Sequence, residues 1–242
     1  MQALTGRDAR YVLRDAAISR WLTFRILATL RPSRYSNRAI ERSTRIAIEG
    51  FPRSANTFAV AAFAVAQGQP LDALHIARHT HAPAQIMRAA RRRLPIILLV
   101  RDPADAVISL VQRERVSPNV ALRSYIAFHT AVAPYAEGMV VALFDQVTGD
   151  FGSVIERLNA RFGTRYQAFT NDPADVEKAM KLVEDLERRD AGGVVSESSV
   201  ARPSALRDED KPRLRSALQS PALAPLLARA NALYERFAAL AR

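Results

Sequence analysis

The chain has 242 residues, 49% of them hydrophobic and 24% charged, which suffices for one domain with a sizeable hydrophobic core. Lys and Arg outnumber Asp and Glu by 35 to 24, and this net charge of +11 favours anionic partners: nucleotides, polyanionic sugars, nucleic acid or anionic lipid. The absence of cysteine excludes disulfides, thiolate metal sites and cysteine nucleophiles, and it fits a reducing, cytoplasmic compartment.

The N-terminal part, residues 8–31, has the apolar periodicity of one long helix interleaved with arginines. Two interpretations are open: a helix packed on the core, or a basic surface helix that contacts a membrane or a polyanion. The first twenty residues lack the apolar stretch of a signal peptide, and the longest apolar run, FAVAAFAVA, is too short to span a bilayer. We therefore expect no transmembrane segment and leave peripheral membrane contact open.

Short apolar runs alternate with helical patterns along the rest of the chain. The predicted strands are 45–51 (RIAIEGF), 71–78 (LDALHIAR), 95–100 (PIILLV) and 138–144 (GMVVALF). The predicted helices are 55–67, 83–93, one opening at Pro103, 120–135, 151–162 and 173–189. This alternation predicts an α/β fold with a parallel sheet covered on both faces. We expect a single domain over residues 1–242, with a polar loop at 191–204 and two final helices split at Pro221.

The segment GFPRSANT, residues 50–57, joins a predicted strand to a predicted helix with the spacing of a phosphate-binding loop. Ala55, Asn56 and Thr57 stand where Gly, Lys and Thr are usual. Backbone amides and a helix N-terminus still suit an anion, but the cation has moved to Arg53 inside the loop. This departure argues against an ordinary ATPase or GTPase. A plain strand-to-helix turn is the alternative.

A second anion motif follows the clearest strand, in LLVRDPADAVISL. Arg101 ends the strand, Asp102 is a candidate helix cap, and Pro103 suits the first helical position. Ser109 lies about two turns into that helix, so a guanidinium and a hydroxyl are placed to hold one phosphate. Because the strand ends in arginine instead of an acidic residue, Mg²⁺ binding is unsupported. The alternative is a helix cap with a surface arginine.

Three histidines, His75, His79 and His81, lie between the two motifs. A zinc site is disfavoured because this spacing matches no common zinc pattern. An exposed basic patch is the plain alternative. On an extended segment His79 and His81 would face the same side, which together with the two anion motifs favours a functional site.

These segments resemble the sulfotransferases that use 3′-phosphoadenosine-5′-phosphosulfate (PAPS). GFPRSANTF resembles the family's 5′-phosphosulfate loop, and VRDPADAVIS resembles its 3′-phosphate motif. RHTHAP and VALFDQVTGD are similar to two further segments of the family. All four stand in the family's order and together cover about residues 45–150.

The resemblance implies a P-loop NTPase-like fold with helical N- and C-terminal extensions, and PAPS as donor without a metal. It implies that His81 is the catalytic base and that Arg53 and His79 assist at the leaving group. The donor-binding residues that it implies are Arg53, Ser54, Ala55, Asn56, Thr57, Arg101 and Ser109, with Arg202 or Arg207 near the adenosine. Ala55 replaces the usual glycine, and His79 stands where many relatives have a lysine.

The predicted function is transfer of a sulfuryl group from PAPS to a hydroxyl or amine by direct in-line attack. A small molecule or a carbohydrate is the expected acceptor, and lipid, phenol and peptide acceptors stay open. Nucleic acid is disfavoured, because only 7% of the residues are aromatic and no basic-aromatic interleaving is present. Two alternatives stay open. The first is a non-catalytic protein on the same fold that binds a nucleotide or a polyanion. The second is a phosphotransferase.

Overall fold

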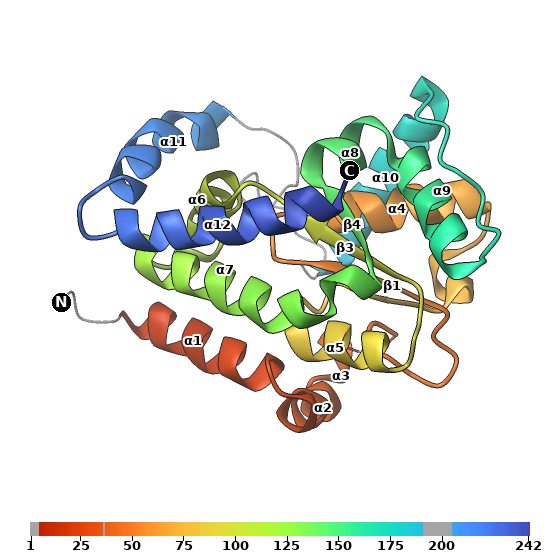
Figure 1. Ribbon diagram of the computed structural model, residues 1–242, viewed down its shortest axis with the longest axis horizontal. Helices are drawn as coiled ribbons and strands as arrows, with labels where there is room; N and C mark the ends of the chain where they lie inside the picture. The colour runs from red at the N-terminus through yellow and green to blue at the C-terminus, as the bar shows by residue number, and fades with distance from the viewer. Residues whose placement is uncertain (1–4, 36, 191–204) are drawn as a thin grey trace.

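The structure is a computed structural model that describes residues 5–35, 37–190 and 205–242. Its centre is a parallel four-stranded sheet with the strand order β2-β1-β3-β4 (Figure 1). The strands are β1 (Ile46–Gly50), β2 (Ile76–Arg78), β3 (Ile96–Val100) and β4 (Val140–Leu143). The predicted α/β architecture with a parallel sheet is therefore confirmed. β2 is shorter than predicted, because a 3₁₀ turn, η1 (Leu71–Leu74), precedes it.

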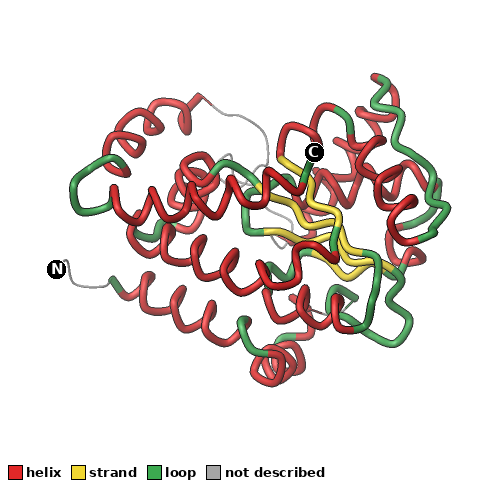
Figure 2. The backbone as a smooth tube through the Cα atoms, in the orientation of Figure 1, coloured by secondary structure: helices red, strands yellow, loops and turns green. Residues whose placement is uncertain are grey.

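Helices cover both faces of the sheet, and alternate strand residues point into the two layers (Figure 2). Ile46 and Ile48 belong to the core under one helical layer, whereas Ala47 belongs to the other core. The first layer holds α4 (Asn56–Gln67), α8 (Phe144–Gly149), α9 (Phe151–Phe162) and α10 (Pro173–Asp190). The second holds α5 (Pro83–Arg91), α6 (Pro103–Glu114), α7 (Pro118–Val132), the 3₁₀ turn η2 (Ala133–Gly138) and α12 (Ala224–Leu240).

The N-terminal part consists of separate helices, so the expectation of one helix over 8–31 was wrong. α1 (Gly6–Ile18) and α2 (Trp21–Leu30) are separated at Ser19 and Arg20, and the four-residue α3 (Pro32–Tyr35) follows. Arg20 is extended, and the hydroxyl of Thr23 donates to the carbonyls of Ala17 (2.5 Å) and Arg20 (3.0 Å) at the break. The turn allows Phe24 to be fully buried against Tyr35, their ring centroids 5.6 Å apart.

The C-terminal part consists of α11 (Ala205–Leu218) and α12, and the predicted split at Pro221 is confirmed. Arg157 of α9 fixes the end of α12, because its guanidinium donates to the carbonyls of Ala241 (2.8 Å) and Val141 (3.1 Å). The loop predicted at 191–204 lies outside the described residues. Within the described ranges, no helix is both long and apolar enough to cross a membrane.

Candidate functional site

The segments that follow β1, β2 and β3 carry all three groups of predicted site residues. Since the three strands are parallel and adjacent, their carboxyl ends meet at one edge of the sheet, which we call the carboxyl edge. Gly50 allows this close arrangement, because a Cβ at that position would lie only 2.3 Å from the carbonyl oxygen of Leu99 on β3.

The loop after β1 bends through the left-handed region twice, at Arg53 (φ 71°) and Ala55 (φ 62°). For an alanine this conformation costs about 1–2 kcal/mol, which explains why glycine is usual at such a position. Asn56 begins α4, and its side-chain amide donates to the carbonyl of Phe51 (2.9 Å) across the loop. The loop therefore turns tightly from β1 into α4 without a glycine after Gly50.

The two anion motifs converge. Arg53 Nε donates to Ser109 Oγ (2.8 Å), and Arg101 Nη1 donates to the carbonyl oxygen of Arg53 (3.0 Å). The Arg101 guanidinium lies 4.0 Å from the ring centroid of Phe144, and the Tyr125 hydroxyl donates to the Arg101 carbonyl (2.8 Å). The sequence predicts that Ser109 acts with Arg101, whereas in the structure the Ser109 hydroxyl bonds to Arg53 and Arg101 contacts the Arg53 carbonyl. The predicted cap is confirmed, because Asp102 accepts from the Asp105 amide (3.0 Å) at the start of α6.

Several buried polar atoms at the carboxyl edge have no hydrogen-bond partner among the described residues. They are Ser54 Oγ, Asn56 Oδ1 and Arg101 Nε. Burial of a polar group without a partner costs about 1–3 kcal/mol, so native structures keep few of them. Ser54 Oγ and Arg101 Nε can donate to an anionic ligand, whereas Asn56 Oδ1 only accepts and needs a donor.

His79 and His81 both reach the same edge, but the segment that carries them is not extended. Their φ angles, 57° and 52°, are left-handed, so the expectation of an extended segment was wrong. The two rings nevertheless meet edge to face with centroids 5.5 Å apart. His79 Nε2 lies 3.1 Å from Thr57 Oγ1 on the first turn of α4. Burial, followed by the charges of His81 and nearby arginines, lowers the pKa of His79 well below its ordinary value, so its ring is neutral at neutral pH.

His81 is oriented by the strand that precedes the anion loop. Its Nδ1 lies 2.9 Å from the carbonyl oxygen of Gly50. A carbonyl oxygen only accepts, so Nδ1 carries the hydrogen and the lone pair of the neutral ring is on Nε2. This is the tautomer that a general base needs.

Glu49 is a site residue that sequence reasoning missed. The fully buried carboxylate accepts from Thr80 N (2.8 Å), Thr80 Oγ1 (2.7 Å), Gln85 Nε2 (2.9 Å) and His81 N (3.2 Å). Burial raises the pKa of Glu49 above its ordinary value, and the four donors act in the opposite direction. Glu49 thus fixes the backbone that presents both histidines. The available signal was an acidic residue inside an otherwise apolar strand.

A pocket opens beside His81, between α1 and α7, which lie along each other in Figure 1. Its empty space of about 300 Å³ includes open solvent, and the enclosed part is about 20 Å³, room for about one water molecule. Phe51 and Phe128 contribute apolar walls, and Asp15 and Ser124, which are hydrogen-bonded to each other, contribute polar ones. The surface beside His81 is therefore partly apolar and partly polar.

Some predicted residues are not brought to the edge or are not described. His75 is exposed and follows η1 with a left-handed φ of 50°. Arg202 and the side chain of Arg207 lie outside the described residues. In the described part of the chain, no three His, Cys, Asp or Glu side chains are grouped closely enough to hold a metal ion. No family model matches the chain, and neither a curated protein nor a solved structure shows significant similarity to it.

Proposed function

We propose that the protein is a PAPS-dependent sulfotransferase with a P-loop NTPase-like fold. The observation that carries this proposal is the convergence of Arg53, Arg101 and Ser109 beside buried polar atoms without partners. Arginine is the side chain best suited to planar phosphate and sulfate groups. An anionic ligand with two charged groups fits two arginines, one in the loop after β1 and one directly after β3.

In this proposal, PAPS binds with its two ends at the two motifs. The 5′-phosphosulfate lies in the loop after β1, where the Ser54 hydroxyl and the N-terminus of α4 face it. The 3′-phosphate is held by Arg101 and Ser109. The Arg101 side chain is already fixed by Phe144 and by the Arg53 carbonyl, so little conformational entropy is lost on binding.

The acceptor enters through the pocket beside His81. His81 Nε2 takes the proton of its hydroxyl or amine while the acceptor oxygen or nitrogen bonds to sulfur. The bond between sulfur and the 5′-phosphate oxygen breaks at the same time, giving the sulfated acceptor and adenosine 3′,5′-bisphosphate. Arg53 and the α4 N-terminus stabilise the charge that grows on the leaving oxygen. His79, being neutral, contributes a hydrogen bond through Thr57 where a lysine would contribute charge.

The test is transfer of labelled sulfate from PAPS to a panel of small alcohols, phenols, amines and carbohydrates. His81→Asn should lower turnover by about 10²–10⁴-fold and leave donor affinity nearly unchanged, because it removes only the base. Asparagine is chosen because it tolerates the left-handed backbone at this position. His75→Asn is the matched control, since His75 has the same backbone conformation but lies outside the site.

Two results would contradict the proposal. Undiminished turnover in His81→Asn would remove the base assignment. Binding of adenosine 3′,5′-bisphosphate with no transfer to any acceptor would favour the non-catalytic nucleotide-binding protein on the same fold.

A further inference from the structure

The outer face of α2 is apolar, although the opposite face of the same helix already packs into the core. Leu22, Ile26 and Leu30 are 73%, 54% and 73% exposed, and their spacing of four residues places them along one side of the helix. We call these three residues the α2 stripe. Large hydrophobic residues exposed elsewhere in the described part of the chain are Val12, Leu13 and Leu240. A continuous exposed stripe of this kind marks an interaction surface more often than scattered single residues do.

Arginines lie on α2 and on the neighbouring helix α5. The guanidiniums of Arg25 and Arg88 lie 5.9 and 5.4 Å from the ring centroid of Trp21, at the start of α2. Arg88 belongs to α5, which packs on α2 and ends at Arg91. Arg92 follows and donates to the carbonyls of Glu41 (2.6 Å) and Arg42 (3.4 Å), which brings Arg42 to the same end of α5.

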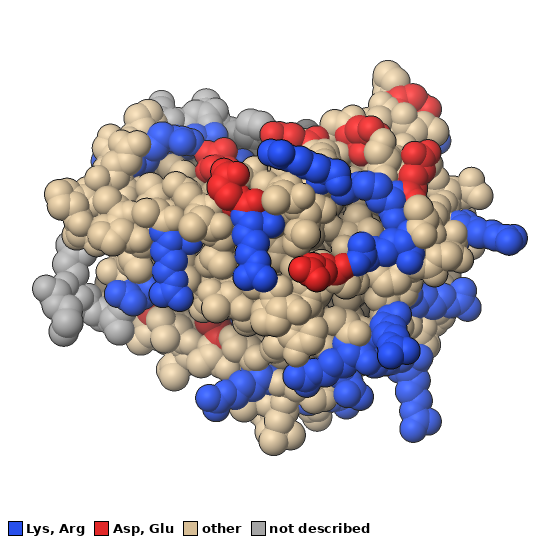
Figure 3. Space-filling model, viewed as in Figure 1, with Lys and Arg blue, Asp and Glu red and all other residues tan. Residues whose placement is uncertain are grey.

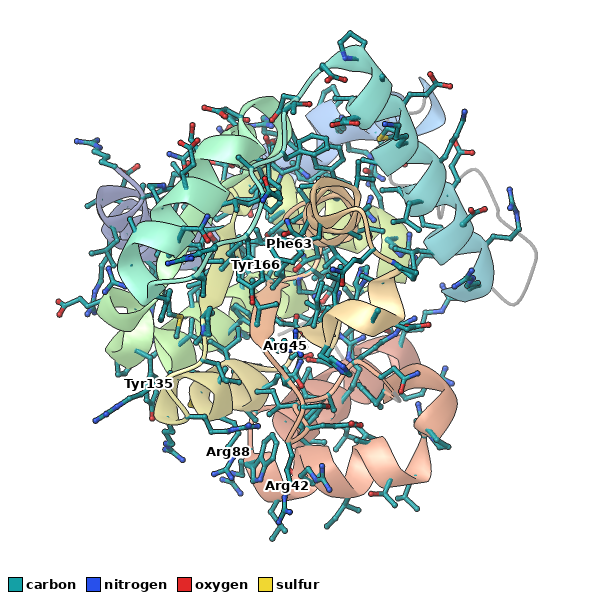
Figure 4. All side chains as sticks on the ribbon, turned by 90° about the vertical axis from the view of Figure 1, so that its right-hand side faces the viewer. Arg42, Arg45, Phe63, Arg88, Tyr135 and Tyr166 are labelled. Atoms are coloured by element: carbon teal, nitrogen blue, oxygen red, sulfur yellow. The ribbon has the colours of Figure 1, made fainter. Side chains whose placement is uncertain are left out.

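The charge on this side of the molecule is mostly positive. α2 and α5 contain no acidic residue, and Glu41 is the acidic residue of the adjoining segment. Figure 3 shows Lys and Arg side chains gathered over the region of α5 and α2, and Figure 4 shows Arg42 and Arg88 beside the N-terminal helices. An apolar stripe between basic side chains is typical of a helix that lies in the interface of an anionic membrane.

We propose that α2 docks on the surface of an anionic lipid bilayer, with the α2 stripe in the acyl boundary and the arginines at the lipid phosphates. A second copy of the chain fits this face less well. A symmetric pair would set arginine against arginine, and three side chains cover far less than the roughly 800 Å² per partner of a stable interface. Nucleic acid would pair with the arginines but leave the α2 stripe without a partner.

Trp21 makes the docking directly measurable, because it is the only tryptophan of the chain and sits half-buried at the start of α2. The experiment titrates the full chain with vesicles of phosphatidylcholine alone and of phosphatidylcholine mixed with phosphatidylglycerol. With the anionic vesicles we expect a blue shift of the Trp21 emission and co-flotation of the protein. Both signals should weaken as salt is added, since the arginine contribution is screened.

Three variants separate the apolar from the basic contribution, with flotation as the readout. L22Q/I26Q/L30Q should weaken partitioning at least tenfold, because about 25 cal/mol is lost per Å² of apolar surface no longer buried. Glutamine is used because its helix propensity is close to that of leucine. Leu240→Gln, at the end of α12 and away from α2 in Figure 1, is the control and should bind as wild type does. R25Q/R88Q should lose about fivefold per arginine.

The proposal is overturned if the protein floats with neither vesicle, or if it floats equally with both. It is also overturned if L22Q/I26Q/L30Q binds as tightly as wild type. A dimer in sedimentation velocity that the same triple variant converts to a monomer would assign the face to a second copy instead.

Discussion

Arg157 and Arg101 both donate to backbone carbonyls, but the protein satisfies the two guanidiniums to different degrees. Arg157 donates to the carbonyls of Ala241 and Val141 and to Gln146 Oε1 (3.2 Å), while Gln146 donates to the Ala241 carbonyl in turn (2.9 Å). At Arg101, Nη1 has the Arg53 carbonyl, but the buried Nε has no partner. The Arg157 network serves the fold alone, whereas the carboxyl edge carries donors that suit a ligand.

An unpartnered atom is not by itself a sign of a binding site, and His129 shows why. Its Nδ1 donates to the Tyr125 carbonyl (2.9 Å), and its buried Nε2 has no partner in the described structure. The rings of Tyr125, Phe128, Phe237 and Phe51 surround it, with centroids 4.0 to 6.0 Å away. His129 Nε2 lies in a packed apolar core, where no ligand can reach it. The unpartnered atoms beside Arg53 and Arg101 instead lie among charged side chains.

The largest expected effect concerns stability in acid. Burial lowers the pKa of His129 from 6.5 to about 4, so as pH falls the unfolded chain takes up the proton first. The contribution of neutral His129 is complete above pH 6.5 and is lost as pH falls toward 4. This difference in pKa corresponds to about 3 kcal/mol of unfolding free energy. His129→Phe should abolish that loss in urea unfolding measured across the range. Parallel pH profiles for wild type and variant would contradict the assignment of His129 to the core.

The next largest effect concerns the Arg157 network. Arg157→Gln removes charge-assisted hydrogen bonds to two carbonyls and should lower the unfolding free energy by about 2 kcal/mol. Binding of adenosine 3′,5′-bisphosphate should not change, because the network does not reach the anion loop. Arg161→Gln, an exposed arginine on the same helix, is the control for charge. If Arg157→Gln keeps the wild-type unfolding free energy but binds the bisphosphate poorly, the contrast between a structural Arg157 and a ligand-binding Arg101 is wrong.

The smallest effect has opposite signs on stability and binding. Ser54 Oγ is buried without a partner, so Ser54→Ala should raise the unfolding free energy by about 1 kcal/mol. The same change removes a donor to the 5′-phosphate and should weaken bisphosphate binding about tenfold. Chemical denaturation and a titration on the same preparation measure both. If Ser54→Ala lowers the unfolding free energy and leaves the affinity for the bisphosphate unchanged, Ser54 serves the fold and not the binding of the ligand.

The sequence predicted the regular parts of the fold well, because short apolar strands and capped helices are encoded locally. Asp102 and Pro103 at the start of α6 are an example. The break at Arg20 was not predictable, since the apolar pattern continues through it and only the burial of Phe24 against Tyr35 requires a turn.

The backbone of the candidate site could not be predicted from the sequence, and its residues stay a prediction. The spacing of Arg101 and Ser109 indicated a shared anion site, but it did not indicate that Arg53 bonds to Ser109. The left-handed conformations at Ala55 and His81 occur at residues other than glycine, so nothing in the sequence indicated them. At His81, hydrogen bonds with Glu49 and Gly50 hold the residue in place. The role of Glu49 depends on Thr80 and Gln85, more than thirty residues away, so periodicity gave no sign of it.

The central claim, that the carboxyl edge holds an adenosine with both a 5′- and a 3′-anion, is tested most directly by calorimetric titration without Mg²⁺. Adenosine 3′,5′-bisphosphate should bind at least tenfold more tightly than AMP or ATP, because leaving a buried charge unpaired typically costs about 2–5 kcal/mol. Arg101→Ala should remove most of that preference and hardly alter AMP affinity, Ser109→Ala should remove a smaller part, and the exposed control Arg93→Ala should change neither. Equal affinity of the wild-type protein for AMP and the bisphosphate would contradict the account.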